Sequence, residues 1–439
     1  MSIGNFITSG EIDRIDGIFS IIMFNFILVA PFIQYYYSYW YPSFYSDRLG
    51  YKWTISTELW MITSSIVVIS FFIFKVTLRP YINSKYKISI RKINKKKLIY
   101  YSVLFLFISL LSQFFIYYKL GGISGYIAAY TIRSEGGGEF SGLGKYMIIA
   151  EPFPVLLIMT LVYFSIYNNR NINYGQVKVL LLILGFLGLL LFFGGLKGSR
   201  SNTMLAMFWL ICVINFYYRK MTIKTLSLVG LIFLLYMTVY GLYKSVGDEF
   251  FNEVNYSNIQ DNDKYRGNAL TGVLSGDLSR YEVQTEIINK VILEDEAIWY
   301  GESYLDAILL AVPSSVMEVL DIKGKTELAT KMLFGEANFV THQAKSTFIF
   351  GLVGESISNF HFVGIIFSSL FLISGYFFLV KLKTSINPKD PRYILIFFFP
   401  IIFVNLYTGD LQNIMFYLLK NLTIPVIFSY MVSERSNEA

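Results

Sequence analysis

The sequence predicts an all-α polytopic membrane protein with ten or eleven transmembrane helices and one large, partly helical exoplasmic loop. Hydrophobic residues make up 54% of the 439 residues and charged residues only 15%. Soluble domains carry about a quarter charged residues. The mean hydropathy is +0.51, and apolar runs of the ~20 residues that cross a bilayer recur along the whole chain.

The apolar runs divide the chain into three parts. We expect membrane helices over 1–244, an exoplasmic loop domain over 245–345, and closing membrane helices over 346–439. The individual helices are expected at about 17–39, 54–75, 98–118, 145–167, 178–195, 201–218, 225–243, 346–360, 362–380, 393–408 and 411–431. The count is ten if the eighth and ninth of these are continuous, and eleven if they are separate.

The distribution of positive charge predicts the orientation. Nine Lys and Arg residues lie between Lys75 and Lys97, after the second expected helix. Cytoplasmic loops are enriched in Lys and Arg, so this segment is expected in the cytoplasm, and both termini with it. The loop 245–345 holds 8 basic and 17 acidic residues, a formal charge of −9, and falls on the exoplasmic side. Because membrane helices flank the basic segment, we expect no nucleic-acid partner.

Two exoplasmic segments carry cations against this rule. The segment 119–144 contains Arg133, and the turn over 194–200 contains Lys197 and Arg200 among three glycines. Glycines let a backbone approach a ligand, and the start of the following helix favours an anion. These cations therefore predict a phosphate or pyrophosphate site. The alternative is that they extend to lipid head groups, as many cations near helix ends do.

The acidic loop adds further candidates. Apolar spacing predicts an amphipathic helix over 267–292, with Arg266 and Arg280 on or near it. Both are candidate substrate-binding residues, although Arg280 could instead pair with Asp277 at helical spacing.

The loop also contains a possible metal motif. Asp261 and Asp263 have the Asp-x-Asp spacing of many sugar-transferase metal sites. A single such motif in an acidic loop is more often a solvated turn, so we predict no metal site and no cofactor.

Candidate catalytic groups follow at the return to the membrane. His342 precedes this return, and Glu355 and Asn359 are four residues apart, which places them on one face of a helix. An ionisable residue at membrane depth is a functional candidate. Glu355 or His342 could act as a general base, with the imidazole titrating nearer neutral pH. The alternative for Glu355 is that it caps or bridges helices.

Several of these segments together resemble the Wzy-type repeat-unit polymerases of O-antigen and capsule synthesis. The resemblance covers the topology and rests on short motifs. They are Lys197-Gly198-Ser199-Arg200 opening a helix, Gly301-Glu302-Ser303-Tyr304 followed by Pro313, and Gly354-Glu355-Ser356 with Asn359-Phe360. Many members place a basic residue directly after the loop proline, whereas this chain has Ser314.

The resemblance implies a GT-C-like glycosyltransferase in the bacterial cytoplasmic membrane. Such enzymes transfer a growing glycan from undecaprenyl pyrophosphate to the non-reducing end of a lipid-linked repeat unit, without a metal. The implied partners are the lipid-linked donor and acceptor, membrane lipids and a chain-length regulator. An O-antigen ligase-type glycosyltransferase is the nearest alternative, and a polysaccharide flippase or transporter is a more distant one.

Overall fold

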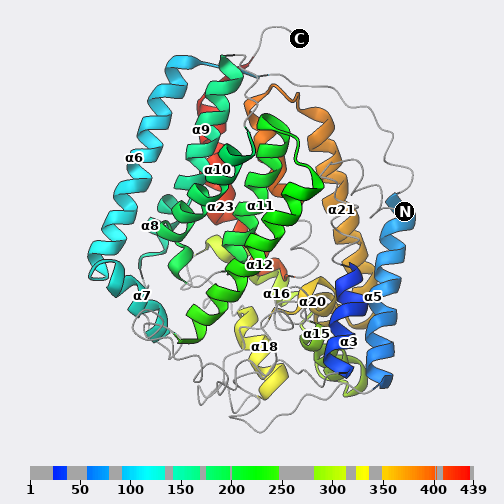
Figure 1. The fold of residues 1–439 in the computed structure, drawn as a ribbon. Helices are drawn as coiled ribbons and strands as arrows, with labels where there is room; N and C mark the ends of the chain where they lie inside the picture. The colour runs from blue at the N-terminus through cyan, green and yellow to red at the C-terminus, as the bar shows by residue number, and fades with distance from the viewer. Residues whose placement is uncertain are drawn as a thin grey trace.

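The computed structural model describes residues 23–36, 57–78, 91–133, 142–168, 175–197, 200–246, 281–312, 323–335, 349–400, 402 and 409–435. Most of these residues are helical (Figure 1), as the sequence predicts. Within them, four helices are long and apolar enough to cross a membrane: Lys95–Lys119, Gly144–Tyr167, Gly351–Ser385 and Leu411–Met431. Shorter apolar helices cover Met61–Ser70, Gln176–Phe192 and Asn202–Tyr218. The chain is thus an α-helical membrane protein, and the count of ten or eleven spans stays a prediction.

One group of helices packs around Trp209, whose side chain is wholly buried. Its ring stacks on Phe398 with 4.9 Å between centroids, and its Nε1 donates to the carbonyl of Ile394 at 3.2 Å. The group consists of α6 (Lys95–Lys119), α9 (Phe153–Tyr167), α10 (Gln176–Phe192), α11 (Arg200–Val213), η3 (Ile214–Tyr218), α12 (Ile223–Val246) and η10 (Pro391–Phe398). Three shorter helices join this group through a small separate core with α6: α7 (Gly122–Arg133), α8 (Gly144–Ala150) and η2 (Gly195–Lys197).

A second group packs around Tyr281, which is also wholly buried. The edge of its ring meets Phe26 with 5.5 Å between centroids, and its hydroxyl lies 2.9 Å from that of Ser64. The group consists of η1 (Asn25–Val29), α3 (Ala30–Tyr36), α5 (Thr57–Leu78), α15 (Tyr281–Ile288), η7 (Asn289–Leu293), α18 (Lys325–Phe334), α20 (Gly351–Phe360), η9 (His361–Val363) and α21 (Gly364–Ser385).

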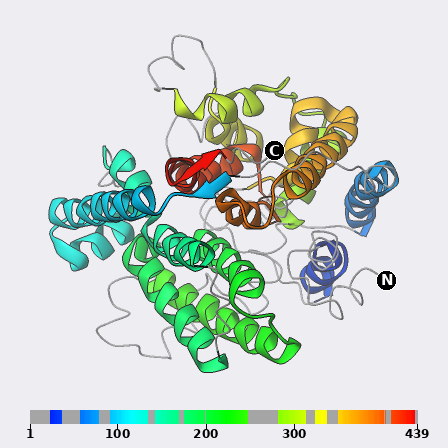
Figure 2. The same ribbon diagram turned by 90° about the horizontal axis from the view of Figure 1, so that it is seen from above.

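The last long helix, α23 (Leu411–Met431), lies between the two groups (Figure 2). The short helix α16 (Glu302–Ile308), continued by η8 (Leu309–Ala311), packs against α23. Asp410 caps α23, because its side chain accepts a hydrogen bond from the backbone N of Asn413 at 3.1 Å. This cap fixes where the helix begins, next to α16.

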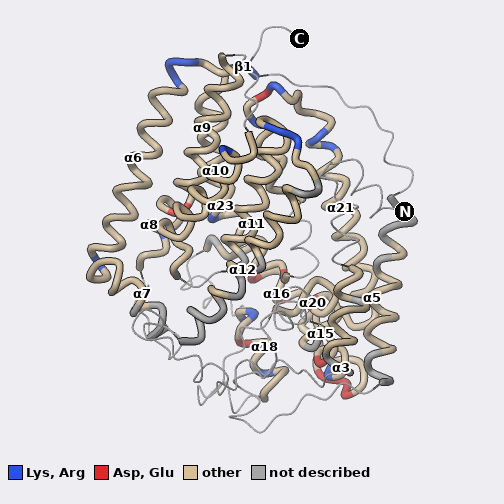
Figure 3. The backbone as a smooth tube through the Cα atoms, in the orientation of Figure 1, with Lys and Arg blue, Asp and Glu red and all other residues tan. Residues whose placement is uncertain are grey.

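A two-stranded ribbon lies at the other end of α23. Strand β1 (Arg91–Ile93) pairs antiparallel with β2 (Ser433–Arg435), which follows α23. The backbone N of Arg91 donates to Oδ2 of Asp390 at 2.8 Å, so three distant segments meet here. Lys and Arg residues gather at this end of the helices (Figure 3). The structure therefore brings together two of the segments that the sequence places in the cytoplasm.

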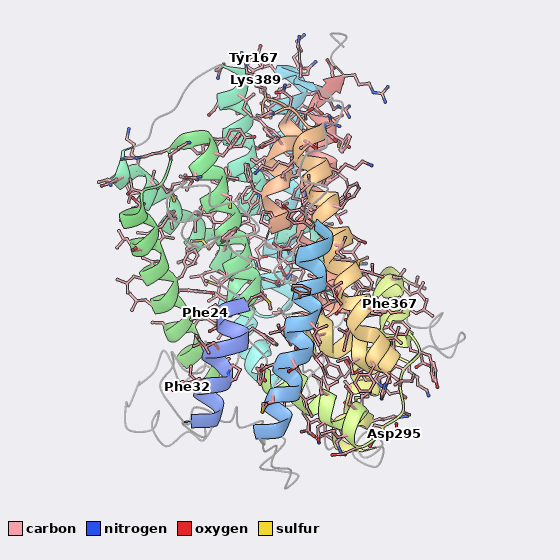
Figure 4. All side chains as sticks on the ribbon, turned by 90° about the vertical axis from the view of Figure 1, so that its right-hand side faces the viewer. Phe24, Phe32, Tyr167, Asp295, Phe367 and Lys389 are labelled. Atoms are coloured by element: carbon pink, nitrogen blue, oxygen red, sulfur yellow. The ribbon has the colours of Figure 1, made fainter. Side chains whose placement is uncertain are left out.

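Apolar side chains cover the outside of the helices between the two ends. Phe24 is 55% exposed and Phe367 is 39% exposed. Both lie between Lys389 at one end of the molecule and Asp295 at the other (Figure 4). A large exposed apolar surface marks contact with a membrane or another protein, and here it surrounds helices of membrane-spanning length.

Two expected helices are interrupted. The helix expected over 145–167 consists of α8 and α9, because Pro152 lacks the N–H that would continue α8 and instead caps α9. The stretch 346–380 contains separate helices α20 and α21 on either side of η9, and His361 adopts a φ of +52° at the break. His361 thus marks the end of α20.

Other expectations are wrong. The segment 119–144, expected as a loop between membrane helices, contains α7, because Tyr126 packs into a small buried core with Tyr117 and Met147. The helix expected over 393–408 begins as the 3-10 helix η10, where Asp390 accepts from the backbone N of Arg392 at 2.9 Å. Helix α18 and the β1–β2 ribbon were not expected.

Candidate functional site

Asn359 fixes the end of α20 to the start of α16. Its Oδ1 accepts from the backbone N of Gly301 at 2.9 Å, and its Nδ2 donates to Oγ of Ser303 at 2.8 Å and to the carbonyl of Glu355 at 2.7 Å. Gly301 has a φ of +93°, which glycine adopts without a steric penalty. Asn359 is wholly buried, and a buried amide is costly unless it is hydrogen-bonded in this way.

Glu355 lies one turn before Asn359 and is also wholly buried. Its Oε1 accepts from Oγ of Ser303 at 2.9 Å, and its Oε2 accepts from the backbone N of Leu411 at 2.7 Å. Leu411 is the first residue of α23, and the start of a helix favours negative charge. Glu355 therefore joins α16, α20 and α23, and the prediction that it shares a helix face with Asn359 is confirmed.

A second set of polar groups links α16, α18 and α23. Lys325, the first residue of α18, forms an ion pair with Asp410, and both side chains are almost wholly buried. The Nζ of Lys325 also lies 4.9 Å from the centroid of the Phe350 ring. Asp306 Oδ2 accepts from the backbone N of Lys325 at 3.0 Å and from Nε2 of Gln412 at 2.9 Å. The three helices thus meet through charged groups rather than through apolar packing alone.

We call these side chains the polar cluster: Ser303, Asp306, Lys325, Glu355, Asn359 and Asp410. It contains three carboxyl groups and one ammonium group, which gives a formal charge of −3 + 1 = −2 when all are ionised. Burial, followed by the charge of Glu355, raises the pKa of the neighbouring Tyr304. An acidic cluster of this kind attracts protons and cations and repels a diphosphate. It is suited to orienting a hydroxyl group and to holding α16 and α18 on α23.

The two cation-bearing segments that the sequence predicts on the exoplasmic side lie beside each other. η2 ends at Lys197 and α11 begins at Arg200, which confirms the predicted turn into a helix. Helix α7, which ends at Arg133, packs against η2. The buried Tyr126 of α7 and Leu196 of η2 belong to the same small core. We call Arg133, Lys197 and Arg200 together the cation region. The structure describes the backbone of these residues and not their side chains.

Hydrogen bonds to backbone carbonyls hold the turn before α11. The carbonyl of Phe192 accepts from Nε2 of Gln113 at 3.1 Å and from the hydroxyl of Tyr117. The carbonyl of Gly195 accepts from the hydroxyl of Tyr240. Side chains of α6 and α12 therefore fix a turn that is rich in glycine. Groups that bind an anion must be held in place by such a supporting layer.

The remaining predicted residues are not placed. His342, Arg266 and Arg280 lie outside the described residues, as do Asp261 and Asp263. Within the part of the chain that the structure describes, no group of three or more His, Cys, Asp or Glu side chains could hold a metal ion.

The sequence reasoning missed Asp306, Lys325 and Asp410. Asp410 had a usable signal, since it directly precedes the last expected helix, where Asp is a favoured cap. Lys325 had none, because it meets Asp410 across 85 residues of sequence.

The fold and site define an α-helical membrane protein with a buried acidic cluster at the start of its last helix and a cation-bearing turn in its first group of helices. Comparison with family models, curated proteins and solved structures finds no match for the chain.

Proposed function

We propose that this protein is a GT-C-like membrane glycosyltransferase that polymerises lipid-linked oligosaccharide repeat units. It moves the growing glycan from undecaprenyl pyrophosphate to the non-reducing end of a new repeat unit on the outer face of the cytoplasmic membrane. The observation that carries the proposal is the packing of α7 against η2. It brings together two segments that hold cations where topology disfavours them. If the cations of each segment only extended to lipid head groups, α7 and η2 would not need to pack against each other.

The chemistry of the leaving group explains the cations. As the acceptor oxygen attacks the anomeric carbon, the sugar–phosphate bond breaks and negative charge develops on the departing diphosphate. Fixed guanidinium and ammonium groups stabilise that charge best where water is scarce. Arg133, Lys197 and Arg200 are the proposed clamp, together with Arg266 and Arg280 of the acidic loop. The proposal requires no metal and no cofactor.

The acceptor hydroxyl must give its proton to a base, either Glu355 or His342. A base must come within hydrogen-bond reach of the proton that it removes. Glu355 is wholly buried, and both of its oxygens already accept hydrogen bonds. This geometry supports a positioning role for Glu355 and Asn359, which hold α16 on α23, and favours His342 as the base.

The lipid tails of donor and acceptor explain why the enzyme lies in the membrane. The gathering of cations at the β1–β2 end supports a cytoplasmic location for that end and for both termini. The acidic loop and the cation region then face the exoplasmic side, where the substrates and a chain-length regulator meet the protein.

The test is polymerisation by the purified full chain in lipid nanodiscs, with a synthetic undecaprenyl-pyrophosphate-linked repeat unit. Wild-type protein is expected to give a ladder of products that chelator leaves intact. Arg200→Gln should lower the rate by about 100-fold or more, as loss of one charge-stabilising donor does. The matched control is Lys97→Gln, which removes an exposed cation at the β1–β2 end and should leave the ladder unchanged.

Two further outcomes would contradict the polymerase. Transfer of finished polymer to a different acceptor, without a ladder, identifies a ligase. Movement of the lipid-linked unit across the bilayer without bond formation identifies a transporter. Within the polymerase, His342→Gln should abolish turnover at an unchanged melting temperature, whereas Glu355→Gln should lower the melting temperature as well as turnover.

A further inference from the structure

A buried ion pair lies within the apolar spans, apart from the polar cluster. Lys420 of α23 contacts Glu151, the residue after α8, and the two side chains are 5% and 10% exposed. Both residues belong to helices of membrane-spanning length. Burying two charges costs more than their attraction usually returns, and apolar residues of similar size often stabilise such a position better. Stability alone therefore does not explain why a charged pair occupies this position.

The pair touches the turn that leads into η2. A Cβ on Gly194 would lie 2.8 Å from Cδ of Glu151, so a larger residue at this position would force the carboxylate to shift. Gly194 also has a φ of +133°, which disfavours other residues. Phe153, two residues after Glu151, stacks on Phe193 at 4.2 Å. The carboxylate thus contacts the ammonium group of Lys420 and lies against Gly194, three residues before Lys197.

The helices that hold the pair place it inside the hydrocarbon layer. Helix α8 ends at Ala150 and α10 ends at Phe192, and the side chain of Glu151 lies against Gly194, so these two helix ends meet at the pair. α9 has 15 residues between the pair and its far end, which is about 22 Å of helix. The hydrocarbon layer is ~30 Å thick. With the far end of α9 at one boundary, the pair lies about 8 Å inside the opposite boundary and about as far from the bilayer centre.

Glu151 supplies the same type of acceptor that a phosphate would. Carboxylate and phosphoryl oxygens are both anionic acceptors for an ammonium group. Lys is a flexible point charge with three donors, which lets it exchange one such acceptor for another. A diphosphate carries more negative charge than one carboxylate and would also meet the cations that follow Gly194 along the chain. Glu151 therefore occupies the position of an anion in the resting protein.

We propose that Lys420 binds the diphosphate of a polyprenyl-diphosphate-linked substrate and that Glu151 is the counter-ion which this diphosphate displaces. The substrate class rests on the proposed function. The inference adds a residue of α23 to a site otherwise built from α7 and α11. Bound substrate thereby contacts the helix whose first residue holds Glu355.

The measurement is the affinity of the full chain, in phosphatidylcholine nanodiscs, for geranylgeranyl diphosphate. Lys420→Gln is expected to weaken this affinity by about 30-fold or more, as truncation of a buried charge partner does. Glu151→Gln is expected to strengthen it by about fivefold or more, because the competing carboxylate is gone. Lys420→Arg keeps the charge and should stay close to wild type.

A purely structural ion pair gives a different result for Glu151→Gln. The affinity would then fall together with stability, or stay unchanged, and either outcome overturns the proposal. If Glu151→Gln does not fold, Glu151→Asp draws the carboxylate back from Lys420 and keeps its charge. This variant should also bind more tightly than wild type, and a weaker or unchanged affinity again overturns the proposal.

Two comparisons identify the source of the anion and separate this inference from the proposed function. Inorganic pyrophosphate should show the same order of variants at lower affinity, whereas phosphatidylglycerol vesicles should bind all variants equally. If the variants differ in binding to phosphatidylglycerol vesicles but not in binding to pyrophosphate, the anion is a lipid head group and the proposal is overturned. If the variants bind diphosphate in the expected order but no product ladder forms, only the proposed polymerase activity is contradicted. A ladder with equal affinities contradicts only the role of Lys420.

Discussion

At the start of α23, Lys325 and Asp410 form an ion pair with side chains 5% and 0% exposed. At the other end, beside β2, Lys97 and Glu434 form an ion pair at 2.7 Å with side chains 46% and 49% exposed. The first pair lies under α16 and α18, whereas water surrounds the second.

This difference in exposure decides what each pair contributes. Water screens an exposed pair, and holding two long side chains together costs entropy, so its net effect is small. A buried pair is different, because removal of one partner leaves the other charge without compensation. Substitutions of the charged residues at the start of α23 are therefore expected to lower the free energy of unfolding strongly. The exposed pair of Lys97 and Glu434 is expected to contribute little to the stability of the fold.

The largest effect is expected at Asp410. Asp410→Ala leaves the buried ammonium of Lys325 without its partner and removes the cap of α23, so the free energy of unfolding should fall by about 3–5 kcal/mol. Cys212 is the single cysteine of the chain and is buried, so its reaction with a thiol-specific fluorophore on heating reports unfolding.

A milder substitution separates the two roles of Asp410. Asp410→Asn keeps an acceptor for the backbone N of Asn413 and loses the charge. Its free energy of unfolding should therefore exceed that of Asp410→Ala only by the contribution of the helix cap, about 1 kcal/mol. If Asp410→Asn melts with wild type, the ion pair does not contribute to stability and the contrast between the two ends fails.

An intermediate effect is expected at Asn359. Asn359→Ala leaves the backbone N of Gly301 without its acceptor and removes the donor to Ser303, whose hydroxyl keeps only Glu355, which should cost about 1–3 kcal/mol of unfolding free energy. The matched control is Asn421→Ala on α23, since Asn421 donates only to the carbonyl of Tyr417 in its own helix at 3.2 Å. Equal melting temperatures for the two variants would contradict a joining role for Asn359.

The same contrast shows which parts of the fold follow from sequence. The expected helices over 98–118 and 411–431 correspond closely to α6 and α23, because a run of some 20 apolar residues in a membrane has to satisfy its backbone as a helix. The β1–β2 ribbon joins Lys92 to Glu434, and no local pattern specifies a contact between residues so far apart.

The site divides in the same way. Helical spacing alone places Glu355 and Asn359 on one face, and both contact Ser303. The partners of that face depend on how α16 and α18 dock on α23, so Asp306 and Lys325 could not be predicted. The contact between η2 and α7, the helix that ends at Arg133, could not be predicted either, because the sequence indicated no helix between 119 and 144.

Two glutamates extend the contrast to pH. Burial raises the pKa of Glu286 on α15, and the nearby Lys290 only partly opposes this. Since the folded-state pKa lies above the unfolded one, the ionised carboxylate opposes folding at neutral pH. Glu286→Gln should therefore raise the melting temperature at neutral pH. The gain should vanish below the unfolded pKa of glutamate, ~4.3. A gain that persists in acid would point to packing rather than charge.

The smallest effect, with the opposite pH dependence, is expected at Glu434. Hydrogen bonds from Lys97 and then Asn94 lower its pKa, so its stabilising effect is present above the unfolded pKa and is lost as pH falls through the folded value. Glu434→Gln should lower the melting temperature slightly at neutral pH, and high salt should remove the difference. If Glu286→Gln raises the melting temperature and Glu434→Gln lowers it, burial determines the effect of the first carboxylate and ion pairing that of the second. The same sign for both would show that exposure does not separate the two ends.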